Sequence, residues 1–488
     1  MPSLGFLKRS GMKQSVTATA QFHLGRFKSK KGEIEMGIPA KDYTKVNPDG
    51  MHDVKQNARK LSIFYTIEVE LSRLIGSWVP RVSGMAEKLT LSRILYEDAD
   101  HANHIQTRLL ELRLTEERVD EFRQRTAPCF KTLEYVDDEV AFMAGLFRVV
   151  KPALLADYRR HIEACPPYVD EPSVRFLRQI IAEQEEHIGK GLSLLADRGI
   201  TWADTAKMEA KLRDELWDLT ALKGNLTDGS FVGKNPVSPP RPTWPDGVEQ
   251  LPATADMPEY PGTYDGDMQR VVHDLVFSEL EAAEIFALYV YEYHQCPWQF
   301  HWESARICWD EARHVELLLN VLERYGGYVG QFPAKAPGYE EFMHLQSPVE
   351  RMIMVSVIAE GEVSTDTQTQ HREAFRKMGD DLTAMLKDYE MADEIVHGQF
   401  GGRWAKSLAE QLDVDYDTAF KAARAALRKF KAQHPDAKGG SQIPLIRLGA
   451  DEEGSKRTIN ITAKKLLGYS DEEIDRLVKE SGGATIEE

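Results

Sequence analysis

The sequence predicts an all-α protein made of two tandem helical bundles joined by a proline- and glycine-rich linker. Two long segments, 53–222 and 268–435, are rich in helix formers and space their apolar residues three and four apart. Between them, residues 223–267 contain prolines at a density that helices do not tolerate. Motifs of the first segment recur in the second at a nearly constant shift, which indicates an internal duplication.

The composition narrows the class of protein before any motif is considered. The chain has 488 residues, a net charge of −17 and four scattered cysteines. Its acidity disfavours non-specific binding of nucleic acid, and the lack of a long uncharged apolar run disfavours a membrane span. The cysteines form no CxxC pair and residues 1–10 lack the apolar core of a secretory signal, so we expect free thiols and a cytoplasmic location.

Shorter regions flank the two helical segments. Residues 1–52 show no clear helical period, and we interpret them as an N-terminal arm whose basic cluster, residues 26–31, is solvated. Residues 436–488 form a C-terminal extension. In it, Ser470 and Glu473 have the spacing of a capping box, which predicts a short helix over 470–479.

The duplication is visible in three aligned stretches. Residues 93–101 align with 306–314 without a gap, at a shift of 213. Residues 182–187 align with 392–397 at a shift of 210, and the stretch that begins at His161 falls on His371 at the same shift. A repeat of this length in helical sequence predicts two bundles in tandem.

The second half carries a metal-binding pattern, Glu-x-x-His, twice. The copies are Glu311 with His314 and Glu394 with His397. Residues three apart share one face of a helix, so each pair can bind the same metal site. One copy would be a weak signal. Two copies, each with an upstream carboxylate mirrored about a turn, favour a metal site over solvated helices.

Each motif needs a further carboxylate from the preceding antiparallel helix. The interval from Glu281 to Glu311 is centred on Cys296, and the proline after this cysteine marks a turn. The interval from Glu360 to Glu394 is likewise centred on a turn signal. Two residues at equal distances before and after a turn lie level with each other on antiparallel helices. Each upstream glutamate can therefore face its motif.

The choice of upstream carboxylate depends on helix rotation, which is known only to about one residue at this level. Glu284 could therefore replace Glu281, and Glu362 could replace Glu360. Spacing favours Glu281, because its repeat partner Glu68 precedes the first-half motif by the same interval.

The predicted metal ligands are four glutamates and two histidines on four helices: Glu281, Glu311, His314, Glu360, Glu394 and His397. This is the ligand inventory of di-iron and di-manganese carboxylate bundles. Carboxylate oxygens with only two imidazoles suit iron and manganese better than zinc or copper. We therefore expect these six residues to form the catalytic site, with two Fe ions, Mn as an alternative at one or both positions, and dioxygen as cosubstrate.

The motifs resemble those of a known family. Residues Asp310–His314 match the Asp-Glu-x-Arg-His form of ferritin-like di-iron carboxylate proteins, especially the bacterial multicomponent monooxygenases. Residues 393–397 match that form with valine in place of arginine. The resemblance implies the six ligands named above and two ferritin-like four-helix bundles. It also implies that Asp310 and Asp393 are partners of the ligand histidines.

The resemblance covers 268–435 well and 53–222 weakly. In the multicomponent monooxygenases, a metal-free ferritin-like subunit packs against the metal-bearing one, so the resemblance implies that this chain is such a pair fused. The first-half counterparts of the six ligands are Glu68, Asp98, His101, Val150, Gln184 and His187. Valine cannot bind metal and glutamine is a poor ligand, which predicts a degenerate, structural bundle. A second metal site, with Glu183 or Glu186 completing it, stays open.

These observations predict a non-haem di-iron (or Fe/Mn) oxidoreductase. We expect an oxygenase or oxidase that activates dioxygen to hydroxylate, desaturate or N-oxygenate a small organic substrate. The sequence holds no flavin, ferredoxin or nicotinamide motif, so a separate electron donor or reductase is the expected partner. A homodimer stays open. The alternative functions are a ferroxidase or iron-handling protein and a metal-free helical scaffold.

Overall fold

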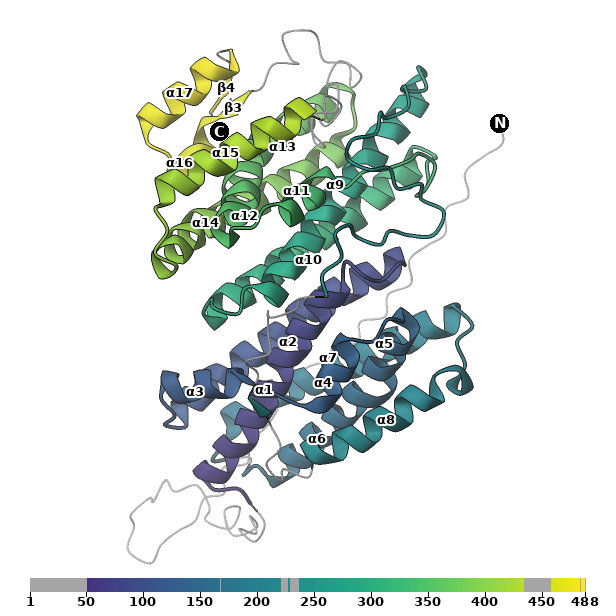
Figure 1. Cartoon of the computed structure of the whole chain (residues 1–488), viewed down its shortest axis with the longest axis vertical. Helices are drawn as coiled ribbons and strands as arrows, with labels where there is room; N and C mark the ends of the chain where they lie inside the picture. The colour runs from purple at the N-terminus through teal and green to yellow at the C-terminus, as the bar shows by residue number, and fades with distance from the viewer. Residues whose placement is uncertain are drawn as a thin grey trace, which may run out of the picture. The chain divides into compact units, whose positions relative to one another are not determined.

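The computed structural model describes residues 51–166, 168–220, 227–228, 237–433, 458–482 and 484–487, which are predominantly helical (Figure 1). The chain divides into two units, 1–50 and 51–488, and every described residue belongs to the second. The predicted N-terminal arm, apart from its last two residues, and its basic cluster lie outside the described residues. The prediction of an all-α protein is confirmed for the part of the chain that is described.

The first half consists of long helices with short ones between them. They are α1 (Val54–Trp78), α2 (Met85–Glu111), α3 (Glu116–Arg123), α4 (Pro128–Glu134), α5 (Glu139–Gly145), π-helix η2 (Leu146–Val150), α6 (Lys151–Ala164), α7 (Glu171–Asp197) and α8 (Trp202–Thr220). Helix α1 begins with a capping box between Asp53 and Gln56, which satisfies backbone N–H groups of its first turn. Helix α2 packs on both α1 and α7.

The second half repeats the pattern of paired long helices. Its helices are α9 (Tyr264–Glu292), α10 (Trp298–Arg324), α11 (Pro337–His344), α12 (Pro348–Met352), π-helix η3 (Ile353–Ser364), α13 (Thr365–Lys377), α14 (Asp381–Gln411), α15 (Tyr416–Gln433), α16 (Ile461–Leu466) and α17 (Asp471–Ser481). Helix α9 packs along α10, and α14 packs along η3 and α13. The predicted capping box of Ser470 and Glu473 begins α17 and is confirmed.

Strands are minor in the described residues. The antiparallel strand β1 (Arg125–Thr126) pairs with β2 (Thr227–Asp228), and β3 (Ile459–Asn460) pairs in parallel with β4 (Thr485–Ile486). Residues 237–263 contain no helix, and one isolated bridge joins Gln250 to Ala334. Parts of the predicted linker, residues 223–226 and 229–236, and of the predicted C-terminal extension, residues 436–457, lie outside the described residues.

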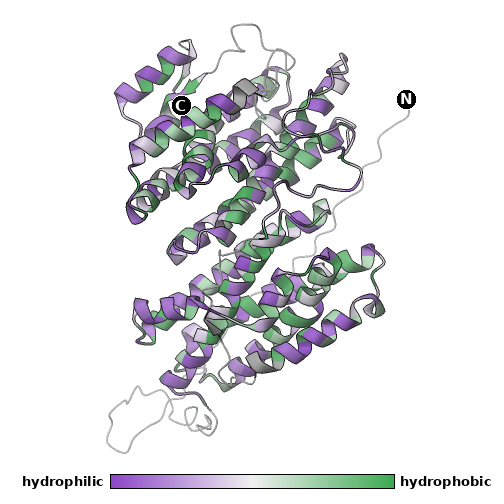
Figure 2. Ribbon diagram, viewed as in Figure 1, coloured by the Kyte–Doolittle hydropathy of each residue, from purple (hydrophilic) through white to green (hydrophobic). Residues whose placement is uncertain are grey.

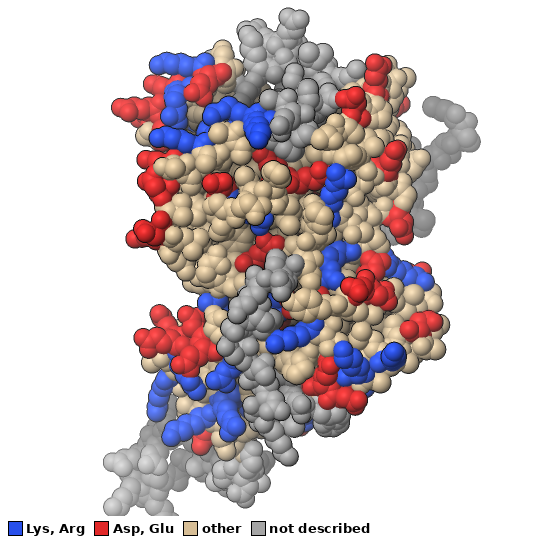
Figure 3. Space-filling view, viewed as in Figure 1, with Lys and Arg blue, Asp and Glu red and all other residues tan. Residues whose placement is uncertain are grey.

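Hydrophobic residues gather along the inner faces of the long helices, and acidic and basic side chains are interspersed over the visible surface (Figures 2 and 3). A continuous core of buried apolar side chains joins these faces. Gly76 allows close approach of α1 to α9, since a Cβ there would lie 2.6 Å from the Ala287 carbonyl oxygen. All four cysteines are buried free thiols, as predicted. None of the described helices has the length and apolar character that crossing a membrane requires.

A fully buried ion pair links α2 to α9. The Lys88 Nζ lies 2.6 Å from Glu284 Oε1 and donates a second hydrogen bond to the Val79 carbonyl at 2.8 Å. Burial lowers the pKa of Lys88, and burial raises the pKa of Glu284 to about 7 although Lys88 opposes that shift. Each charge therefore depends on the other for stabilisation, because both side chains are shielded from solvent.

We expect Lys88→Met to lower the free energy of unfolding by about 3–5 kcal/mol, because Glu284 then stays buried without its cation. Denaturant unfolding at neutral pH measures the loss. The double variant Lys88→Met/Glu284→Met removes both charges and should recover most of the stability. If Lys88→Met is as stable as the parent protein, the ion pair does not contribute to the free energy of unfolding.

Candidate metal centre

The structure brings five of the six predicted ligands together. Glu311 and His314 lie on α10, Glu394 and His397 on α14, and Glu360 on η3. Their ligand atoms form two overlapping groups, and within each group the atoms lie within 4.8 Å of one another. Glu311 and Glu394 belong to both groups. Two carboxylates shared by two groups have the arrangement needed to bridge a pair of metal ions.

Glu281 does not join these groups, and Glu279 takes the place predicted for it. The first group consists of Glu279, Glu311, His314 and Glu394. The Glu279 Oε2 lies 3.8 Å from His314 Nδ1, whereas Glu281 accepts a hydrogen bond from the Tyr339 backbone N–H at 3.2 Å. Positions two apart on a helix are separated by about 200°, so Glu279 and Glu281 cannot face the same site.

The prediction of Glu281 rested on an ungapped repeat. Glu281 precedes Glu311 by the same number of residues as Glu68 precedes Asp98. The contacting pair, Glu279 and Glu311, is separated by a longer interval. The helix ends would have identified Glu279, because it precedes the C-cap of α9 by the same interval as Glu311 follows the N-cap of α10.

The two alternative carboxylates lie outside both groups. Glu284 is paired with Lys88, as described above. Glu362 is paired with Arg424 of α15. Both carboxylates therefore have a cation of their own.

Several ligand atoms are buried without a hydrogen-bond partner, which fits a metal site. They are Glu311 Oε1, Glu394 Oε2 and both ring nitrogens of His397. His397 Nδ1 lies 2.9 Å from Glu311 Oε1, but the two groups lack hydrogen-bond geometry. Buried polar atoms are normally satisfied. Glu311 Oε1, Glu394 Oε2 and His397 Nδ1 face one another, so they surround a position suited to a cation, whereas His397 Nε2 faces Asp310.

Burial and mutual charge interactions shift the pKa values of the buried carboxyl and imidazole groups in this cluster. Burial, together with the charges of Glu394 and Glu311, raises the pKa of Glu360 well above its ordinary value. Burial lowers the pKa of His397, but the charge of Glu311 and the neighbouring carboxylates of Asp310 and Glu394 outweigh it and raise that pKa well above the ordinary value. Protons therefore neutralise this cluster when no cation is bound.

The ligand histidines are supported from their outer side, as the resemblance implied. The His314 Nε2 lies 3.2 Å from Asp393 Oδ2, and the His397 Nε2 lies 3.7 Å from Asp310 Oδ2. Each aspartate thus faces the histidine of the other motif. Arg313 bridges the two aspartates. Such outer partners orient a metal-binding imidazole and fix its tautomer.

A buried lysine beside the centre was missed in the sequence. Lys387 is fully buried on α14 and pairs with Glu390, one turn before Glu394. Burial raises the pKa of Glu279, but the neighbouring His314 and the charge of Lys387 outweigh it and lower that pKa. The signal was present as a Lys-x-x-Glu pair on the ligand face of α14.

The C-terminal extension supports the helix that holds Glu360. The Lys464 Nζ on α16 is fully buried and donates to the carbonyls of Gly361 at 3.1 Å and Glu362 at 2.9 Å. It also bonds the Thr365 hydroxyl at 2.8 Å. These carbonyls belong to η3, whose i→i+5 pattern is rare and is found mostly at functional sites.

A cavity of about 210 Å³ opens beside the cluster, between α9, α11, η3 and α13. Glu279, Glu360 and Glu394 form part of its wall. The rest of the wall combines apolar side chains with polar ones, which include Thr367, Gln368 and two further carboxyl groups, Glu281 and Glu341. The ligand groups are thus accessible from one side.

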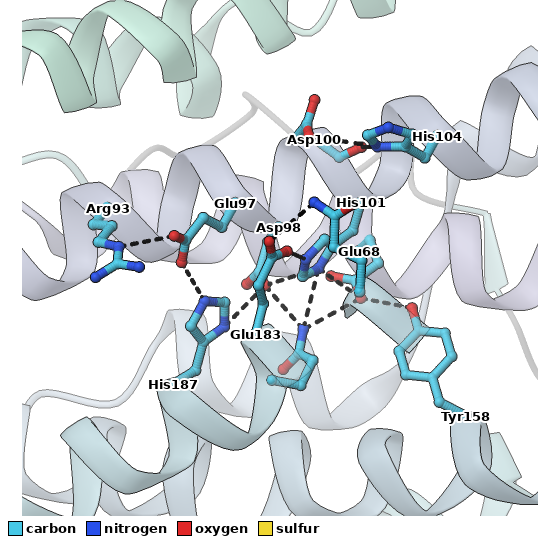
Figure 4. Close-up of polar contacts among 12 residues, drawn as sticks. Glu68, Arg93, Glu97, Asp98, Asp100, His101, His104, Tyr158, Glu183 and His187 are labelled. Carbon is cyan, nitrogen blue, oxygen red and sulfur yellow. Dashed lines mark hydrogen bonds and ion pairs between the residues drawn. The ribbon is translucent and has the colours of Figure 1, made fainter. Parts of the chain in front are cut away.

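The first-half counterparts also converge, but around a lysine. Figure 4 shows Glu68, Asp98, His101 and His187 pointing toward one another from α1, α2 and α7. Glu68, Asp98 and His101 form a third group of potential ligands. Lys151 Nζ lies among them, 2.8 Å from both carboxylate oxygens of Asp98.

The two glutamates considered for a first-half site do not enter this group. Glu183 lies 2.7 Å from the outer nitrogen of His101, Nε2 (Figure 4). Glu186 pairs with Arg93 and Lys190 on the surface. Val150, the counterpart of Glu360, is a buried apolar side chain.

Matched substitutions distinguish Glu279 from Glu281. We expect Glu279→Gln to lower the metal content from about two ions per chain to about one, since it removes a charged ligand of one group. Glu281→Gln should keep about two, because an amide oxygen still accepts the Tyr339 N–H. Elemental analysis of the purified variants measures both. Loss of metal in Glu281→Gln alone would show that the sequence-based assignment was right.

Residues 203–437 match the model of a family described as a protein of unknown function, DUF455. The match begins in α8 and ends just after α15, so it includes all members of the second-half groups. No curated protein matches the chain. No solved structure matches it either.

Proposed function

We propose that the chain is a di-iron oxygenase or oxidase that acts on a small organic substrate. Support comes chiefly from one observation: two buried ligand groups share Glu311 and Glu394 and border a cavity. In this proposal α9, α10, η3 with α13, and α14 form a metal-bearing ferritin-like bundle. Helices α1, α2, α6 and α7 form its metal-free partner.

Charge balance supports two divalent ions. Five buried carboxylates surround the site, and Lys387 contributes one positive charge. If all are ionised, four negative charges remain, which is the charge of two divalent cations. The carboxylates are Glu279, Glu311, Glu360, Glu390 and Glu394. Oxygen ligands with two imidazoles favour iron or manganese.

Bound iron would supply the redox chemistry that reduces dioxygen with electrons from an outside donor. The residues of the chain have other tasks. Glu311 and Glu394 belong to both groups and would help to hold each ion, and Asp310 and Asp393 would orient the histidines. The apolar cavity wall limits the water that reaches the site.

The cavity restricts the substrate in size and polarity. An apolar cavity of about 150 Å³ holds one benzene, so a cavity of about 210 Å³ suits a molecule of about eight heavy atoms. Ile285, Met354 and Ile358 supply apolar wall, and Gln368 Oε1 is a buried acceptor without a partner. A mainly apolar molecule that carries hydrogen-bond donors fits these groups best, because the polar part of the wall includes Gln368 Oε1 and the carboxyl groups of Glu281 and Glu341.

Oxygen uptake after anaerobic loading with Fe²⁺ tests the proposal. We expect uptake to stop after about two Fe²⁺ per chain are oxidised, and to continue with a chemical reductant and a suitable neutral compound. Ala282 lines the cavity, and the variant Ala282→Phe places a larger side chain in it. This variant should keep the metal and lose the substrate-dependent oxygen uptake. Continued oxidation of excess Fe²⁺ with mineral formation would indicate a ferroxidase. No metal binding would indicate a scaffold.

A further inference from the structure

The ammonium group of Lys151 lies where the first half would otherwise hold a metal ion. Its Nζ is 2.8 Å from both carboxylate oxygens of Asp98, 3.1 Å from Gln184 Oε1 and 3.2 Å from His187 Nδ1. The Lys151 side chain is fully buried. Hydrogen-bond distances to four ligand-type atoms leave no room for a cation beside it.

These partners are the counterparts of one second-half metal group. Asp98, Gln184 and His187 correspond to Glu311, Glu394 and His397, which with Glu360 form the second of the two groups. The fourth counterpart is Val150, the residue before Lys151. The first half has therefore lost the carboxylate at this place and has gained a cation at the next residue.

The electrostatics of the first-half cluster are complete without metal. Burial lowers the pKa of His101, but the carboxylates of Glu68 and Glu183 outweigh it and raise that pKa to about 10. Lys151 and the imidazolium of His101 thus lie beside the two central carboxyl groups, Glu68 and Asp98, and burial raises the pKa of Asp98 to about 7 although Lys151 opposes that shift. Burial and the charge of Lys151 lower the pKa of His187, which stays neutral.

The neutral ring of His187 completes this arrangement. Its Nδ1 accepts from Lys151, as a metal-binding imidazole would donate its lone pair to an ion. Its Nε2–H donates to Glu97 at 2.5 Å, the position that Asp310 has in the second half. His187 therefore keeps the carboxylate partner on its outer nitrogen that a metal-binding histidine has, although its inner nitrogen faces Lys151.

We propose that Lys151 is a built-in cation that replaces a metal ion, and that removing it turns the first-half cluster into a site for a divalent transition metal. The ligands would be Glu68, Asp98, His101 and His187, with Gln184 as a neutral neighbour. This inference does not depend on the proposed function, because it concerns residues of the first half alone.

Titration with Co²⁺ tests the inference in a background that lacks the second-half site. The double variant Lys151→Ala/Glu394→Ala should bind about one Co²⁺ per chain, with visible d–d absorption and a higher thermal midpoint. Glu394→Ala alone should bind none, because its Lys151 is intact. Lys190→Ala/Glu394→Ala, which removes an exposed lysine of α7, is the matched control and should also bind none.

The outcomes separate the two proposals. No Co²⁺ bound by the folded double variant, or equal binding in the chain that keeps Lys151, would overturn this inference. If Lys151→Ala folds only when Co²⁺ is present, the metal dependence supports it. If it does not fold at all, Lys151→Gln, which keeps the hydrogen-bonding side chain without the charge, takes its place. Failure of that folded variant to bind Co²⁺ would then overturn the inference.

Discussion

Replacing Glu394 with alanine should reduce the metal content from about two ions per chain to nearly none. Glu394 belongs to both second-half groups, and it lies one turn from His397 on the same face of α14. Loss of a shared carboxylate removes a ligand from each ion at once. It also removes one of the negative charges that balance them. Elemental analysis after purification in iron-supplemented medium gives the result directly.

The matched control is Glu362→Gln. Glu362 lies two positions from Glu360 and its carboxylate pairs with Arg424, outside both groups. This variant should retain both ions. Full metal retention in Glu394→Ala, or equal loss in both variants, would contradict the assignment of Glu394 as a shared ligand.

Removing the metal should destabilise the protein, and more so at high pH. A ligand present at about 1,000 times its dissociation constant stabilises a fold by about 4 kcal/mol, and two ions together should exceed this. Chelation should therefore lower the thermal midpoint by many degrees. The loss at about pH 8.5 should be greater than that at about pH 6.

The sign follows from the protons of the apo cluster. Glu360 has a raised pKa when folded, so its proton stabilises the apo fold at low pH, and this contribution fades as pH rises above the ordinary glutamate pKa. His314 and His397 also have raised pKa values, and their contribution fades as pH rises above the ordinary histidine value. Metal ions replace these protons, so metal binding tightens over the same range.

Calorimetry with and without a chelator at the two pH values measures this effect. The Glu394→Ala variant serves as the control, since a chain without metal should not respond to the chelator. A chelator-induced decrease in thermal midpoint that becomes smaller as pH rises would contradict this prediction.

The helical motifs were predictable because they are local. Glu311 and His314, like Glu394 and His397, share a face through the helical period alone, and the sequence also placed Glu360 correctly in the cluster. The capping box of α17 is local in the same way. Such features need no knowledge of how distant helices pack.

The site residues that the sequence analysis did not identify depend on how distant helices pack against one another. The sequence predicted Glu281 and did not consider Glu279, because the two halves were aligned without a gap, and a shift of two positions moves a side chain to the opposite face of the helix. Lys151 and Lys464 carry no motif, and only packing brings their ammonium groups to Asp98 and to the η3 carbonyls. Buried lysines are rare, yet the sequence does not say which lysine is buried.

Metal content per chain, with an optical spectrum, is the most direct test of the central claim. Protein made in medium that contains both iron and manganese should hold about two Fe ions per chain, all lost in Glu394→Ala. A large manganese share would keep the two-ion site and change the metal. Protein that contains no metal, even after anaerobic preparation with Fe²⁺, would contradict the claim that the second half is a di-metal site.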